Sequence, residues 1–167
     1  MSSAAHRRPS FLARRMLFQD GMGSRMRLDG VECKVEGQQA VARVRLSLDD
    51  DVRTGFSSAP AAGPGWQRAV AEATLQAVSA FVGGGVVFTL DSVTEVRTGR
   101  YPLIVVTIVM HDGQREIFLS GTSRIKDHPP TAVARAVLHG LNRWTESLLT
   151  RALNADPLLD HPGQAVH

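Results

Sequence analysis

Alternating hydrophobic and polar positions run through most of the chain after residue 27. In the clearest stretch, Ala40, Ala42, Val44, Leu46 and Leu48 occupy every second position. Because successive side chains of a strand point to opposite faces, this period of two predicts a strand with one packed face. The opposite face carries two arginines, and we expect it to be wet.

Turn residues divide the region into further strands. A hairpin turn is expected at Gly37, and the three aspartates at 49–51 predict a turn rather than a calcium loop, since further oxygen ligands do not follow at the required spacing. Turns are also expected at 98–100 and 111–113. The predicted strands cover 31–35, 40–48, 52–57, 86–96, 101–110 and 115–121.

Two segments change to the helical spacing of three and four residues. The first helix is predicted over 66–81 and ends at the glycines of 83–85. The second is predicted over 131–153, with Asp127 as its N-cap. Trp66 and Trp144 fall on the apolar stripes of these helices, so core packing explains them better than base stacking.

The order of elements repeats, and so do the letters. The motif Ala-Val-Ala-x-Ala-x-Leu begins at Ala69 and again at Ala132, which lies 63 residues later, and a Gly-x-Ser precedes each helix at Gly55 and at Gly121. The sequence therefore predicts a duplicated βββα unit. The expected fold class is α+β, with an antiparallel sheet or sheets and two helices packed on one face.

This pattern predicts three regions. A basic arm covers 1–27 and is expected to be partly disordered or to form a short helix over 11–18. A single α+β domain covers 28–155, with repeats at about 28–84 and 85–155. Residues 156–167 are expected to be a disordered tail.

The strand at 101–110 is apolar on both faces. Leu103, Val105 and Val109 lie on one side, opposite a second apolar row. If two helices shield one face of a six-stranded sheet, the other face needs another layer, most simply the same sheet of a second subunit, which predicts a homodimer. In the alternatives, the two units form separate sheets that pack within one chain, or the arm covers the open face, and either arrangement would permit a monomer.

Composition limits the class of protein. The chain has 167 residues, of which 43% are hydrophobic, and a single cysteine. It contains no apolar stretch near the ~20 residues of a membrane-spanning helix, so we expect a cytoplasmic protein with no membrane partner. Residues 1–28 hold six arginines and one aspartate. An alternative function is therefore nucleic-acid binding through arginines of the arm and of the wet strand face, namely Arg7, Arg8, Arg14, Arg15, Arg43 and Arg45.

Catalytic chemistry does not show itself in the sequence. The six histidines lack the spacing of a zinc site, and Ser123, Asp127 and His128 lack a nucleophile-elbow motif. We therefore predict no catalytic residue, no metal and no cofactor. A small α+β enzyme whose catalytic groups meet only in three dimensions is the remaining alternative.

A resemblance to a known family rests on the second junction and helix. Gly121-Thr122-Ser123 is followed by Ala132-x-x-x-Ala136-x-Leu138-x-Gly140-Leu141-Asn142-Arg143. Together with the duplication, this resembles the C-terminal regulatory domain of 2-isopropylmalate synthases, over residues 31–144. The resemblance implies a dimerisation module that binds a small amino-acid-like effector near the strand-to-helix loops. The catalytic barrel of the synthase is not expected in 167 residues, so the module would act on a protein partner, on nucleic acid or as a scaffold.

The predicted effector site consists of residues at the two strand-to-helix junctions. Helix N-termini present unpaired amide donors, which suit a carboxylate. The candidate residues are Gly55, Ser57, Gly63, Gly121, Ser123 and Asp127.

Overall fold

The computed structural model describes residues 26–154 and confirms the duplicated βββα architecture. The first unit consists of β1 (Arg27–Glu36), β2 (Gln39–Leu48), β3 (Asp51–Pro60) and α2 (Gly65–Val82). The second consists of β4 (Val87–Thr98), β5 (Tyr101–His111), β6 (Glu116–Arg124) and α3 (Pro129–Asn154). The predicted arm helix at 11–18, most of the arm and the tail lie outside the described residues.

The strands form two separate antiparallel sheets of three strands, in the orders β1-β2-β3 and β4-β5-β6. The idea of a single six-stranded sheet was therefore wrong, and the alternative of two sheets within one chain is correct. We call β1–β3 the first sheet and β4–β6 the second sheet. Each has a register irregularity in its first strand, at 28–30 and at 90–92.

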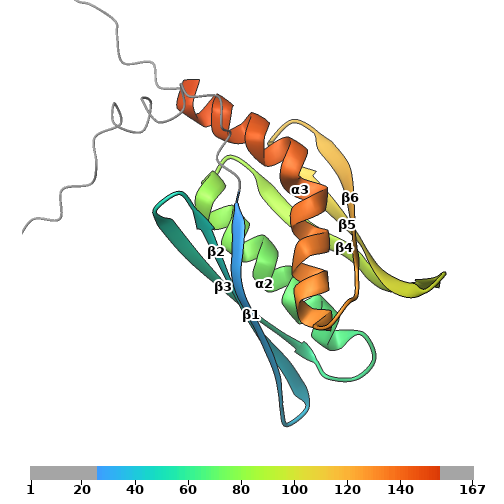
Figure 1. Cartoon of the computed structure of the whole chain (residues 1–167). Helices are drawn as coiled ribbons and strands as arrows, with labels where there is room; N and C mark the ends of the chain where they lie inside the picture. The colour runs from blue at the N-terminus through green and yellow to red at the C-terminus, as the bar shows by residue number, and fades with distance from the viewer. Residues whose placement is uncertain (1–25, 155–167) are drawn as a thin grey trace, which may run out of the picture.

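The two helices lie between the two sheets, which flank them on opposite sides in Figure 1. Helix α2 packs on β2 and β3 of its own unit and also contacts β4, while α3 packs on β5 and β6 and also contacts β1. Because α2 has neighbours on several sides, most of its circumference is buried. Its exposed or half-exposed strip is Arg68, Glu72, Gln76 and Ala80, which recur every fourth residue.

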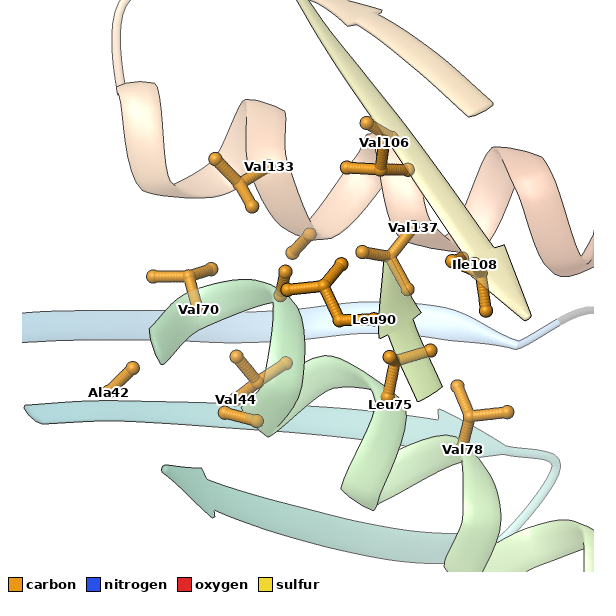
Figure 2. Packing of buried hydrophobic residues seen from close by; sticks show 14 of the residues in the cluster. Ala42, Val44, Val70, Leu75, Val78, Leu90, Val106, Ile108, Val133 and Val137 are labelled. Atoms are coloured by element: carbon orange, nitrogen blue, oxygen red, sulfur yellow. The ribbon is translucent and has the colours of Figure 1, made fainter. Parts of the chain in front are cut away.

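One hydrophobic core joins both units (Figure 2). Val44 from β2, Val70 and Val78 from α2, Val106 from β5 and Val137 from α3 point into the same space. Their side chains are almost completely buried. Because the alanines of the repeated motif are also buried in both helices, the helices can approach the sheets closely, as that motif predicted.

Each unit contains one glycine that brings a helix directly onto a strand. A Cβ atom at Gly55 would overlap the carbonyl oxygen of Ala73 and lie 2.8 Å from the backbone nitrogen of Ala77. A Cβ atom at Gly121 would overlap the equivalent atoms of Ala136 and Gly140. Only glycine, which lacks a Cβ, permits this approach, so the duplicated Gly-x-Ser has a packing role in both units.

A helix side chain also covers the open edge of each sheet. The N–H of Phe56 in β3 donates to Oε1 of Gln76 at 2.6 Å, and the N–H of Thr122 in β6 lies 3.1 Å from Nδ1 of His139. Gln76 and His139 are 63 residues apart, the same offset as the helix motif. Both contacts satisfy a backbone donor on an edge strand, where an unpaired donor invites pairing with other chains.

Several predicted boundaries need correction. Strands β3 and β6 continue past Ser57 and Gly121, to Pro60 and Arg124, so each Gly-x-Ser lies inside a strand rather than at its end. Asp127 is not the N-cap of α3, because the helix starts at Pro129. The residue before it, His128, caps the first turn: the N–H of Thr131 donates to Nδ1 of His128 at 3.3 Å.

Candidate functional site

The structure places four of the six predicted effector residues on strands that face the helices. Gly55 and Gly121 are buried in the helix contacts described above. The hydroxyl of Ser57 donates to Oε2 of Glu72 on α2 at 2.9 Å. Ser123 is half-buried at the equivalent position of β6. These residues therefore have structural neighbours within their own unit.

The other two residues lie in the loops before the helices. Gly63 has a φ of +61°, which favours glycine, and its loop position is exposed, as is that of Asp127. Both helices begin at the same end of the domain, at the lower right in Figure 1. The two hollows described below are lined by other residues, so neither brings the six candidates together.

The side of the first sheet that faces away from the helices, the first outer face, is charged. Arg43 and Arg45 lie there in β2, beside Glu32 of β1 and Phe56 of β3. The Arg43 guanidinium lies over the Phe56 ring, 5.7 Å from its centre. Gly30, Glu32, Arg43 and Arg45 line a hollow of about 100 Å³. The predicted wet face of β2 is thus present, whereas Arg7, Arg8, Arg14 and Arg15 of the arm lie outside the described residues.

The side of the second sheet that faces away from the helices has a different composition. This second outer face consists of the alternate residues Leu103, Val105, Thr107, Val109 and His111 of β5 and their register partners in β4 and β6. The other side of β5, with Ile104, Val106 and Ile108, lies in the core. The prediction that β5 is apolar on both faces is therefore correct.

Apart from the Asp91 carboxylate described below, the charged side chains of the second outer face lie at its two ends. The three central rows across the sheet contain only uncharged side chains, which are listed by row as Thr89, Val109 and Phe118, then Ser92, Thr107 and Ser120, then Thr94, Val105 and Thr122. Glu116 lies at one end of β6 and Arg124 at the other. Phe118 is 72% exposed and Val87 is 59% exposed, large values for apolar side chains.

The polar groups at the centre of this face are paired with one another. The Thr107 hydroxyl donates to Oδ2 of Asp91 at 2.7 Å and lies 2.6 Å from the hydroxyl of Ser92. Asp91 belongs to the irregularity of β4, and this hydrogen bond places its carboxylate beside Thr107 of the central strand. Because these hydroxyls already have partners, covering them would not leave them without hydrogen bonds.

A second hollow of about 280 Å³ lies beside the edge of the second sheet. Phe118, Leu119 and Ser120 of β6 and His139, Gly140 and Trp144 of α3 line it. In the first unit, Phe81 occupies the position equivalent to Trp144, and the Arg53 guanidinium lies 5.9 Å from the centre of its ring. Leu119 replaces Arg53 in the second unit, and Gly140 replaces Ala77. The residues that line this hollow thus differ from their equivalents in the first unit.

Two pKa shifts have structural causes. Burial raises the pKa of the Cys33 thiol, which lies on the helix side of β1. The backbone N–H groups of Gln114 and Arg115 hold the pKa of the Asp112 carboxyl below its ordinary value, in the turn between β5 and β6. Neither shift calls for an acid-base role. Within residues 26–154, no group of three His, Cys, Asp or Glu side chains is arranged to hold a metal ion.

The sequence matches no protein-family model, and it has no significant match among curated proteins. Neither helix of the described chain is long and apolar enough to cross a membrane.

The exposed residues on the outer side of β6 were not identified from the sequence. Phe118, Glu116 and Arg124 share one side of β6 with Ser120 and Thr122, and their alternation could have been noticed. The predicted strand ended at Gly121, because glycine followed by polar residues is typical of a loop. That early end left Arg124 off the sheet.

Proposed function

We propose that this chain is a non-catalytic, homodimeric scaffold or regulatory domain in which two copies meet through the second outer face. The observation that carries the proposal is the exposed Phe118 on a face whose three central register rows contain no charged residue, with Asp91 of the β4 irregularity as the carboxylate that reaches the central row. Interface centres are depleted of charged residues, whereas ordinary solvated sheet faces are not. Within the described residues, no helix or loop covers this face, since both helices lie on the other side of the sheet.

The size of the face supports a second copy of the chain as the occupant. Strands β4, β5 and β6 contain 12, 11 and 9 residues. At ~3.3 Å per residue and ~4.8 Å per strand, the face measures roughly 35 by 14 Å, which is about 500 Å² in projection. Accessible area exceeds projected area, because side chains are corrugated. A stable interface buries about 800 Å² per partner, so this face suits a dimer of modest affinity.

The first outer face lacks these properties. Its central positions hold Arg43, Arg45 and Glu32, and stacking it on another copy would desolvate all three. The two sheets have matching topology, so the contrast between their outer faces comes from side chains alone. This contrast supports the second face as the site of association.

The regulatory part of the proposal rests on the resemblance to the synthase regulatory domain. The duplicated βββα unit is compatible with that resemblance, and so is a dimer. Effector binding at the six residues of the two strand-to-helix junctions stays a prediction. Thermal shift with amino acids and short carboxylates tests effector binding. A ligand that raises the Tm of the wild-type chain but not that of Asp127→Ala supports binding at this site. We place the domain in the cytoplasm, since a single cysteine needs no oxidising compartment.

Light scattering coupled to size exclusion tests the dimer. The full chain is compared with the variant Phe118→Asp and with a control, Phe56→Asp. Phe56 is an exposed aromatic residue on the first outer face, in the edge strand β3. We expect a dimer for the chain and for Phe56→Asp, and a monomer for Phe118→Asp, because a buried unpaired carboxylate opposes association. A monomeric wild-type chain at tens of micromolar would contradict the proposal.

A second candidate function is binding of single-stranded nucleic acid at the first outer face. The stacked Arg43 and Phe56 pair, with Arg45 beside it, offers a cation and an aromatic ring to a base and its phosphate. Retention of a short oligonucleotide should then fall with salt, and Arg43→Gln/Arg45→Gln should weaken it further. Retention that is insensitive to both changes would exclude this function.

A further inference from the structure

We infer that the two copies stack face to face with opposite strand directions, about a two-fold axis that passes over Thr107 perpendicular to the strands. This inference rests on the proposed homodimer and names its geometry. Closed dimers are overwhelmingly two-fold symmetric, so each surface residue must meet a partner fixed by the axis. The distribution of charge on the second outer face selects this axis.

The perpendicular axis pairs opposite charges. It places each strand of the second sheet against the same strand of the partner, running the other way. Glu116 and Arg124 lie four residues to either side of Ser120 in β6. The axis therefore brings Glu116 toward the partner's Arg124, twice per dimer. Stacked sheets are ~10 Å apart and rotated by ~30°, a gap that these two long side chains together can bridge.

The same axis matches apolar side chains at the centre. Val109 and Val105 lie two residues to either side of Thr107. Val109 therefore meets the partner's Val105, and Leu103 meets the end of the partner's β5 near His111. Phe118 lies against the partner's Thr122, whose methyl group it can contact. The central row, with Ser92, Thr107 and Ser120, meets itself.

The alternative axis runs parallel to the strands and pairs charges with apolar side chains. It places β6 over the partner's β4, so Glu116 meets the partner's Val87 and Arg124 meets the partner's Val96, as the register shows. Covering a charged group with an aliphatic side chain costs free energy without a compensating partner. The perpendicular axis avoids this cost.

One consequence of the perpendicular axis concerns Asp91. Its carboxylate accepts a hydrogen bond from Thr107 of the central strand, so this axis brings it toward the partner's Asp91 near the centre of the interface. Like charges that face each other weaken association and make it sensitive to salt. Asp91→Asn should therefore tighten the dimer by severalfold at low salt.

Charge reversal tests the geometry on the full-length chain. The dimer dissociation constant is measured by sedimentation equilibrium at low salt for the wild-type chain, Glu116→Arg, Arg124→Glu and the double variant. Each single variant should weaken the dimer about tenfold or more, because two like-charged pairs replace two opposite pairs. The double variant restores opposite pairs and should return to within about threefold of wild type. Far-UV circular dichroism of all four chains verifies that these exposed substitutions leave the fold intact.

The outcomes separate this inference from the proposed function. Recovery in the double variant supports the perpendicular axis. If neither single variant weakens a stable dimer, the perpendicular axis is wrong but the homodimer is still supported. The same conclusion follows if the double variant binds as weakly as the single variants. A wild-type chain that is monomeric throughout overturns both.

Discussion

The close approach of α3 to β6 at Gly121 gives the sharpest test of the fold. Replacing Gly121 by alanine adds one methyl group on the side of β6 that faces α3. This Cβ would lie 2.9 Å from the Cα of Gly140 and would overlap the carbonyl oxygen of Ala136, whereas ordinary contacts begin at 3.4 Å. The clash involves helix backbone, which cannot rotate away as a side chain would, so α3 must move by about 1 Å.

The cost of that movement follows from the packing. If α3 retreats by about 1 Å over a contact of roughly 100 Å², it opens about 100 Å³ in the core, which costs ~2.4 kcal/mol at ~24 cal/mol per Å³. Residual overpacking adds ~1 kcal/mol. We therefore expect Gly121→Ala to lower the free energy of unfolding by about 3 kcal/mol, a large share of the ~5–15 kcal/mol that is typical of a domain. Gly55→Ala should behave similarly, since the same atoms surround it.

Urea unfolding at one fixed protein concentration measures this effect, followed by far-UV circular dichroism. The matched control is Gly30→Ala in β1, because a Cβ there meets nothing within 4 Å. We expect the control to lie within about 0.5 kcal/mol of wild type, as surface substitutions usually do. If Gly121→Ala is no less stable than Gly30→Ala, the close approach of α3 to β6 is wrong.

Three further predictions concern single side chains. His128→Ala should lower the free energy of unfolding by ~1 kcal/mol, since it removes the acceptor for the N–H of Thr131. His128→Asn should retain most of the wild-type stability, because asparagine is also a good N-cap. Equal losses for the two variants in urea unfolding would contradict the capping role. The pKa of Asp112 is lowered in the folded chain, so its ionised form stabilises the fold above its ordinary pKa of 3.8, and this contribution disappears as the pH falls through the lowered pKa. The stability difference between wild type and Asp112→Asn should therefore shrink below about pH 4, and a difference independent of pH would refute this. Burial raises the pKa of Cys33, so a thiol reagent at pH 8 should react more slowly with the folded chain than with the urea-unfolded chain; equal rates would count against a thiol packed beneath the first sheet.

Sequence patterns were sufficient for the elements and their repetition. The alternation from Ala40 to Leu48 correctly assigned the buried side of β2, because period two is a local property of strands. The alanine motif at Ala69 and Ala132 identified two equivalent helices, whose small side chains lie in the core. Gly83 ends α2 with a φ of +82°, as the glycine run indicated.

Properties set by distant neighbours were beyond these patterns. Alternation shows which residues share a face but not which strands are adjacent, so it could not decide between one sheet and two. Strand β6 continues to Arg124 because Leu103 of β5 lies opposite it, a pairing that Thr122 and Ser123 do not suggest locally. The helix start is displaced by one residue from the predicted cap, because Pro129 suits the first helical position and makes His128 the cap.

Two of the candidate site residues have a structural role that the sequence did not indicate. Glycines at the junctions were assigned to an effector, whereas Gly55 and Gly121 have a packing role that becomes visible only when helix and strand are brought together. The apolar row with Leu103, Val105 and Val109 was identified from the sequence, and it forms the centre of the second outer face. The charged residues at the ends of that face were not recognised, because the predicted strand stopped before the true end of β6 at Arg124.

Distances between spin labels on two copies of the full-length chain show directly whether the second outer face joins them. Single cysteines replace Ser120 on the second outer face or Ser58 on the first, each in a Cys33→Ser background. Sheets and helix layers stack ~10 Å apart, so the account predicts a separation below about 20 Å for labels at 120 and roughly 50 Å for labels at 58. A short distance at 58, or no dipolar coupling at either position, would show that the second outer face does not join two copies.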